Sequence, residues 1–226
     1  NDITNAVVKV LHVPYKYAFT FTSTIHFIPM FMNDMKGIME AQTARGVEFD
    51  AGGKTLAWFV MTNQGGPAAR AAHFSIHPNA YRDTTPWQYT VDAGGTATDY
   101  FNIGSGYGDG KYDLSMVGPN RFLRRFQGDA TKAGKSVEVS TRYAVEPGTG
   151  KLALYFKMAN SGSSSVKFTI TSNHYRSDGP WTYTVAAGAS TEDFFNAVAY
   201  NNGWYDFTIT VDSDSTWSRR FTGHLE

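Results

Sequence analysis

Two pairs of adjacent arginines are the most distinctive charged residues of this chain of 226 residues. Arg124-Arg125 and Arg219-Arg220 each lie in a run with strand-like alternation, so one arginine of each pair faces outward and the other inward. An inward arginine needs a partner, because an unpaired buried charge is strongly destabilising. The candidate partners recur in the same way and are Asp99 and Asp193, or Asp113 and Asp206. We therefore expect structural ion pairs at these positions; a ligand-binding role would require an arginine exposed beside aromatic rings.

Trp204 and Tyr107 are the aromatic residues with the best prospect of touching a ligand. Trp204 corresponds to Lys111 in an internal repeat described below, and a position that accepts either Trp or Lys is expected to be exposed. An exposed tryptophan at the end of a loop suits a membrane interface or a sugar-binding platform. Tyr107 lies in the glycine-rich stretch 104–110, which lacks the Lys-Ser/Thr ending of a phosphate loop and leads into a strand. Trp58 is a further candidate for contact with carbohydrate.

A methionine-rich segment near the N-terminus is a second candidate for binding. Apolar residues between positions 28 and 39 follow a helical spacing. Such a helix could pack on its own domain, or it could form an insertion that contacts lipid or a partner protein, since methionine side chains adapt to varied apolar surfaces. The residues proposed for this contact are Phe27, Met30, Phe31, Met32 and Met35.

Catalytic and metal-binding patterns are weak throughout the chain. His73 and His77 share one face of a predicted strand, but a zinc site needs three or four ligands and no third is evident. The run Asp212–Thr216 matches a D-x-D-x-T phosphatase signature, yet it occupies a hairpin turn rather than the end of a parallel strand. A calcium ion on this turn is the alternative to a purely structural turn. We predict no catalytic residue, no metal and no cofactor.

The composition excludes several classes of protein. Twenty basic and twenty acidic side chains leave no cationic surplus for wrapping nucleic acid or for a polybasic membrane tether. The absence of cysteine excludes disulfides and thiolate sites. No apolar run reaches the roughly 18–20 residues of a transmembrane helix. A hydrophobic share of 42% is too high for a disordered chain, so a folded protein with a substantial core is expected.

An internal repeat organises these residues. Residues 81–102 and 175–196 are identical at 12 of 22 positions without a gap. Each copy offers about seven short strands separated by turn residues, which is the pattern of a β-sandwich. We predict an all-β protein of two tandem homologous sandwiches, Ig-like or C2-like, at 46–130 and 131–226. Residues 1–45 would form an N-terminal extension that contributes a strand to the first sandwich.

The strands of the second copy can be placed individually. Alternating apolar and polar residues predict strands near 136–144, 151–159, 165–171, 181–186, 190–196, 203–211 and 216–222. Trp87 and Trp181 each follow a proline and begin a strand, so both are expected to anchor the core.

The repeated blocks also resemble a known family. Ala97–Phe126, together with the closing blocks Gly203–Thr208 and Arg219–Glu226, is similar to the C-terminal domain of bacterial phosphocholine-specific phospholipases C. The resemblance covers roughly residues 45–226 and implies two such domains in tandem behind a catalytic domain. It implies that the catalytic chemistry lies upstream, that the protein is secreted or periplasmic, and that the tandem binds a lipid or membrane surface, substrate, or the catalytic domain. Other hypotheses are a protein-interaction module and a carbohydrate-binding sandwich.

Overall fold

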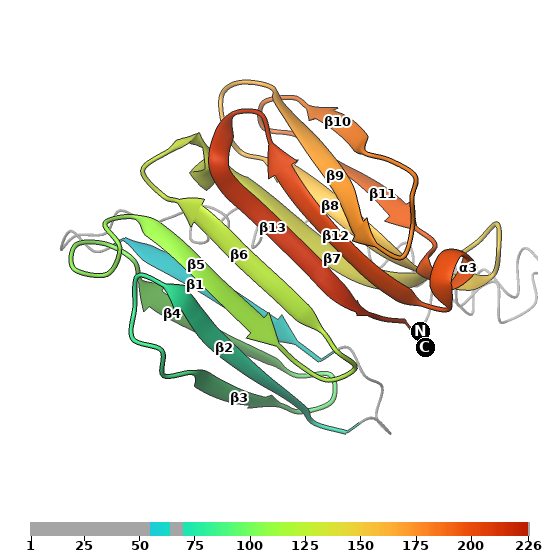
Figure 1. Cartoon of the computed structure of the whole chain (residues 1–226), viewed down its shortest axis with the longest axis horizontal. Helices are drawn as coiled ribbons and strands as arrows, with labels where there is room; N and C mark the ends of the chain where they lie inside the picture. Colours follow the sequence, from blue (N-terminus) through green and yellow to red (C-terminus); the bar gives the residue numbers. More distant parts are fainter. Residues whose placement is uncertain (1–54, 64–69, 226) are drawn as a thin grey trace, which may run out of the picture. The chain divides into compact units, whose positions relative to one another are not determined.

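The computed structural model describes residues 55–63 and 70–225, all within one compact unit that runs from Val47 to Glu226. The fold is almost entirely β-structure, arranged in antiparallel sheets (Figure 1). The prediction of tandem β-sandwiches is confirmed. The predicted N-terminal extension lies outside the described residues, as do the five candidate contacts between Phe27 and Met35.

The first repeat contributes six strands within the described residues. They are β1 (Leu56–Thr62), β2 (Ala72–Ala80), β3 (Trp87–Val91), β4 (Thr96–Asn102), β5 (Lys111–Val117) and β6 (Leu123–Asp129). Their burial alternates along the strand, as it does in β2, where Phe74 and Ile76 face the core and Ser75 is only half-buried. This alternation is what a sheet with one buried face requires.

The second repeat contains all seven strands that the sequence predicted. They are β7 (Val137–Glu146), β8 (Lys151–Asn160), β9 (Val166–His174), β10 (Trp181–Val185), β11 (Ser190–Phe195), β12 (Trp204–Val211) and β13 (Asp214–His224). Two short helices, η1 (Ala133–Ser136) and α3 (Ala197–Asn201), lie before β7 and between β11 and β12. The sequence pattern did not indicate α3, which is a single turn capped by the side chain of Asn196.

One sheet runs through both repeats. Its eight strands follow the order β10-β9-β12-β13-β6-β5-β2-β3, so β13 of the second repeat pairs with β6 of the first (Figure 1). The pairing is antiparallel and centred on Arg125 opposite Arg220, with Arg124 opposite Phe221 and Arg219 opposite Phe126. Because equivalent residues are exchanged across this centre, the repeats are related by a pseudo-twofold axis between the two strands. Two smaller sheets, β1-β4 and β11-β8-β7, complete the two sandwiches.

Each repeat has its own aromatic core. In the second repeat the ring of Phe156 is 5.0 Å from Phe221 and 5.6 Å from Phe207, in edge-to-face contacts. Both predicted tryptophan anchors begin their strands and pack on a core. Burying a large aromatic side chain contributes roughly 1.5–3 kcal/mol, so these cores supply most of the driving force for folding.

Candidate functional site

The outward arginines form ion pairs within their own repeats. Arg125 donates to Asp113 at 2.8 and 2.6 Å, and Arg220 donates to Asp206 at 2.9 and 2.7 Å. Burial is the largest single effect and would raise the pKa of each aspartate, but the arginine and asparagine hydrogen bonds and the arginine charge together outweigh it and hold the pKa below the ordinary value of 3.8. Each carboxylate also accepts from an asparagine amide, so neither is left open for a ligand.

Arg219, the inward arginine of the second repeat, has no aspartate partner. It pairs with Glu138 at 2.8 and 2.7 Å and donates to the hydroxyl of Tyr112 and to the backbone carbonyls of Gln127 and Ser218. Its own side chain is 5% exposed, whereas that of Glu138 is 48% exposed. The half-exposed carboxylate of Glu138 therefore neutralises the buried guanidinium of Arg219 from the solvent side.

Arg124, the inward arginine of the first repeat, makes no ion pair with any residue that the structure describes. It donates to the carbonyls of Leu123 and Thr222 and to the hydroxyls of Tyr143 and Tyr205, at 2.9 to 3.1 Å. Its guanidinium also lies 4.1 Å from the ring centre of Phe122. The cation is thus held by neutral oxygens and an aromatic face.

Each of the two inward arginines contacts a tyrosine of the other repeat. Arg124 of the first repeat reaches Tyr205 of the second, and Arg219 of the second reaches the equivalent Tyr112 of the first. Asp99 and Asp193, the other partners considered from the sequence, instead accept from the hydroxyls of Tyr89 and Tyr183. The sequence could indicate that these arginines face inward, but it could not show that they cross between the repeats.

Trp204 lies at one end of the shared sheet, where residues of both repeats meet. Gly203, with φ at +93°, turns the chain from α3 into β12 and places Trp204 at the first position of the strand. The indole ring is half-buried, 4.6 Å from the ring of His224 and 6.0 Å from that of Tyr175. Tyr175 is 43% exposed, and Tyr200, whose ring stacks on Arg176 next to Tyr175 in the chain, is 55% exposed. We call the group of Trp204, Tyr175, Tyr200 and Arg121 the Trp204 end.

Arg121 of the first repeat lies over this aromatic group. Its guanidinium is 4.8 Å from the ring centre of Trp204. Arg121 and Asn120 form the β5–β6 turn, and both have positive φ, at 57° and 53°. Such a turn matches the twist of a hairpin, but a side chain like arginine adopts it at a cost of about 1 kcal/mol or more. The strained turn holds a cation against an aromatic ring of the other repeat.

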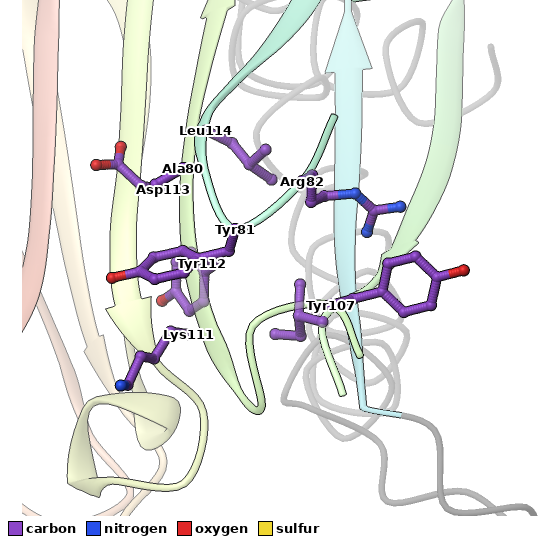
Figure 2. Close-up of a pocket in the computed structure, with 9 residues that line it drawn as sticks. Ala80, Tyr81, Arg82, Tyr107, Lys111, Tyr112, Asp113 and Leu114 are labelled. Atoms are coloured by element: carbon purple, nitrogen blue, oxygen red, sulfur yellow. The ribbon is translucent and has the colours of Figure 1, made fainter. Parts of the chain in front are cut away.

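Tyr107 lies at the opposite end of the sheet. The sheet neighbours from β5 to β12 are all antiparallel, so β5 and β12 start at opposite ends, with Tyr107 just before β5. Figure 2 shows Tyr107 and Arg82 on the same side of a narrow hollow, with the guanidinium 5.0 Å from the tyrosine ring. The second repeat has the same arrangement, with Arg176 3.8 Å from the ring of Tyr200. Tyr107 therefore stacks on an arginine of its own chain.

A cleft of about 250 Å³ opens at the junction of the two repeats. We call it the junction cleft. Its lining residues are Pro119, Asn120, Phe122, Tyr143, Leu152, Tyr205, His224 and Leu225. The first three come from the β5–β6 turn of the first repeat and the others from the second repeat. Nothing in the sequence indicated this cleft, because its walls are assembled only when β6 pairs with β13.

The other residues singled out from the sequence make contacts within the fold that suit a structural role. His73 contacts Thr90 and Gln88 on the sheet surface, and His77 contacts Ser75. Asp214 of the D-x-D-x-T run accepts from the backbone of Thr216 and Gly134, in keeping with a turn. Within residues 55–63 and 70–225, no group of three or more His, Asp or Glu side chains is placed to hold a metal ion. The ring centre of Trp58 on β1 lies 4.9 Å from that of Tyr100 on β4.

Among the helices in the described part of the chain, none has the length and apolar character needed to cross a bilayer.

Comparison with known proteins gives a consistent result over both repeats. A family model described as the C-terminal domain of bacterial phospholipase C matches the chain twice, over residues 41–129 and 136–224. A non-hemolytic phospholipase C of Burkholderia pseudomallei is 30% identical over 142 residues, which are 62% of this chain and 19% of that protein. A non-hemolytic phospholipase C of Pseudomonas aeruginosa is 30% identical over 182 residues, or 79% of this chain and 25% of the relative.

A third relative, a hemolytic phospholipase C of Pseudomonas aeruginosa, is 29% identical over 122 residues, which are 52% of this chain and 16% of that protein. The chain thus spans no more than a quarter of the length of these three relatives.

Proposed function

This chain belongs to the family of bacterial phospholipase C C-terminal domains, and we propose that it is a non-catalytic accessory tandem that attaches to a lipid surface through its Trp204 end. In this proposal the chemistry of the whole protein resides in a separate catalytic domain upstream. The tandem would act outside the cytoplasm, secreted or in the periplasm, and would present its partner domain to phosphocholine lipids.

The observation that carries the proposal is the position of Arg121 over Trp204. Tryptophan and tyrosine favour the interfacial region of a bilayer, where their rings are apolar and their polar atoms remain hydrated. Arg121 forms no ion pair with any described residue. Its charge is therefore available to a lipid phosphate, while Trp204 and Tyr175 supply the aromatic contacts at the same end of the sheet.

Both repeats contribute to this end, which gives the tandem arrangement a function. Because β5 and β12 run in opposite directions, the end of β5 and the start of β12 lie at the same end of the sheet, with β6 and β13 between them. A single repeat would supply either the arginine turn or the aromatic residues. The lipid-binding surface would therefore require the pairing of β6 with β13.

Co-sedimentation with phosphatidylcholine vesicles tests the proposal. We expect the chain to sediment with vesicles, and we expect Trp204→Lys to reduce the bound fraction at least several-fold. Lysine stands at the equivalent position of the first repeat, Lys111, so this change is compatible with the local fold. Tyr107→Ser, at the opposite end of the sheet, is the matched control and should bind as the unaltered chain does.

Two outcomes would overturn the proposal. One is that the chain fails to sediment with phosphatidylcholine vesicles. The other is that Trp204→Lys, shown by circular dichroism to be folded, binds as tightly as the unaltered chain.

A further inference from the structure

The junction cleft contains a hydroxyl proton with no acceptor among the described residues. The hydroxyl oxygens of Tyr143 and Tyr205 are 2.6 Å apart, and both accept from the same nitrogen of Arg124. The two hydroxyls carry two protons, and the short contact between them uses only one. The other must point elsewhere.

Burial decides which proton is left over. Tyr205 is 1% exposed, whereas Tyr143 is 37% exposed. A buried donor without an acceptor costs about 1–3 kcal/mol, so Tyr205 donates to Tyr143 rather than the reverse. The proton of Tyr143 then faces the open side, which is the junction cleft that both tyrosines line.

The charge around this proton favours an anion. Arg124 is 4% exposed and has no carboxylate partner within the described residues, so its positive charge is not neutralised locally. None of the residues that line the cleft is acidic. A tyrosine hydroxyl that accepts from a guanidinium becomes a better donor, because hydrogen bonds in a chain polarise one another.

Most of the remaining lining is apolar, with Asn120 and His224 as its polar residues besides the two tyrosines. Pro119, Phe122, Leu152 and Leu225 supply its walls. The cleft volume of about 250 Å³ lies just below the roughly 300–1,000 Å³ of typical small-molecule sites, which suits a small ligand. The cleft thus combines a hydrogen-bond donor backed by a cation with four apolar side chains in its walls.

We propose that the junction cleft binds the oxyanion of a small amphiphilic anion, with the Tyr143 hydroxyl as the donor, Arg124 as the charge behind it, and the apolar walls around a short hydrocarbon chain. The oxyanion can belong to a phosphate ester or to a carboxylate. The cleft adjoins the Trp204 end, because His224 lines the cleft and also contacts Trp204, but its binding is measured with soluble ligands and needs no vesicle.

Titration by nuclear magnetic resonance with soluble probes tests the inference on the full chain. Hexyl phosphate and hexanoate are the two anionic probes, inorganic phosphate supplies a head without a chain, and hexyltrimethylammonium supplies a chain with a cation. We expect saturable shifts of the amides of Phe122 and Leu225 with at least one anionic amphiphile. Which of the two binds identifies the head group, and inorganic phosphate should bind at least tenfold more weakly.

Two variants locate the binding. Tyr143→Phe removes the donor and keeps the ring, and we expect about tenfold weaker binding, the loss typical of one hydrogen bond to a charged group. Asn120→Asp adds a carboxylate to the lining, and aspartate tolerates the left-handed conformation of this turn as asparagine does. It should also weaken the binding of anions. Tyr155→Phe, on β8 outside the cleft lining, is the control and should leave affinity unchanged.

The inference is overturned if neither anionic amphiphile gives saturable shifts at the cleft, or if hexyltrimethylammonium binds as tightly as the anions. It is also overturned if Tyr143→Phe and Asn120→Asp both retain full affinity. The proposed lipid attachment has a different test, because Trp204→Lys affects vesicle binding and leaves the Tyr143 hydroxyl in place.

Discussion

Replacing Arg219 with methionine should destabilise the protein far more than removing an exposed arginine of matching geometry. Arg219 and Arg142 each hold a glutamate through two hydrogen bonds, at 2.8 and 2.7 Å to Glu138 and at 2.9 and 2.5 Å to Glu192. The arginine side chains are 5% and 45% exposed, respectively. The pair of substitutions therefore compares the same interaction at two depths.

The expected loss for Arg219→Met follows from the groups it leaves behind. Methionine fills part of the space of the arginine stem but cannot donate to Tyr112, Gln127 or Ser218. Removing one partner of a buried ion pair costs about 3–5 kcal/mol, and Glu138, half-exposed, regains some hydration. We expect a loss of about 3 kcal/mol. Arg142→Met should cost less than about 1 kcal/mol, as exposed pairs do.

Equilibrium unfolding in urea measures both values. With a slope of about 3 kcal/mol per molar urea, a loss of 3 kcal/mol lowers the midpoint by about 1 M. If both repeats unfold together, the transition stays single and its slope unchanged. Equal losses for Arg219→Met and Arg142→Met would refute the assignment of Arg219 as a buried cation that links the repeats.

Three other predictions concern the turn before β12, the acid limb of stability and the repeat interface. Gly203→Ala should lower stability by several kcal/mol in thermal unfolding, because the added carbon would overlap the carbonyl oxygen of Leu225. Gly150 is also at positive φ but has open space around it, so Gly150→Ala should cost only about 1 kcal/mol. The contribution of Asp206 to stability should be constant above the unfolded pKa of aspartate near 4 and be lost as the pH falls below it, because the pKa of Asp206 is lower in the folded state; Asp206→Asn should flatten the acid decline in urea titrations between pH 5 and pH 2. The second repeat expressed alone should form a symmetric dimer through β13, because the register about the pseudo-twofold axis lets a second β13 replace β6; a strictly monomeric species in sedimentation equilibrium at high concentration would contradict this.

The strands were predictable because their signals are local. Alternation over five or more residues and the turn residues between them located every strand of the second repeat, and Trp87 and Trp181 were recognised as core anchors from their place at the start of a strand. The internal repeat then extended the same reasoning to the first copy. A short helix such as α3 carries too few residues for a periodic signal.

The contacts between the repeats were not predictable, because they depend on which edges of the sheets pair. Once β6 lies beside β13, Arg124 and Arg219 cross into the opposite repeat, and Arg121 reaches Trp204. No spacing along the chain encodes these contacts. The positive φ of Arg121 also has no sequence signal, since arginine rarely adopts it.

Lipid contact by Trp204 is the central claim, and fluorescence quenching tests it most directly. Vesicles of brominated phosphatidylcholine quench tryptophans that enter the bilayer interface. We predict that they quench part of the emission of the unaltered chain and that Trp204→Phe removes this quenched part, while Trp58→Phe, on β1 in the separate β1-β4 sheet, leaves it in place. Emission that brominated vesicles leave unchanged, or quenching that persists in full after Trp204→Phe, would contradict attachment through the Trp204 end.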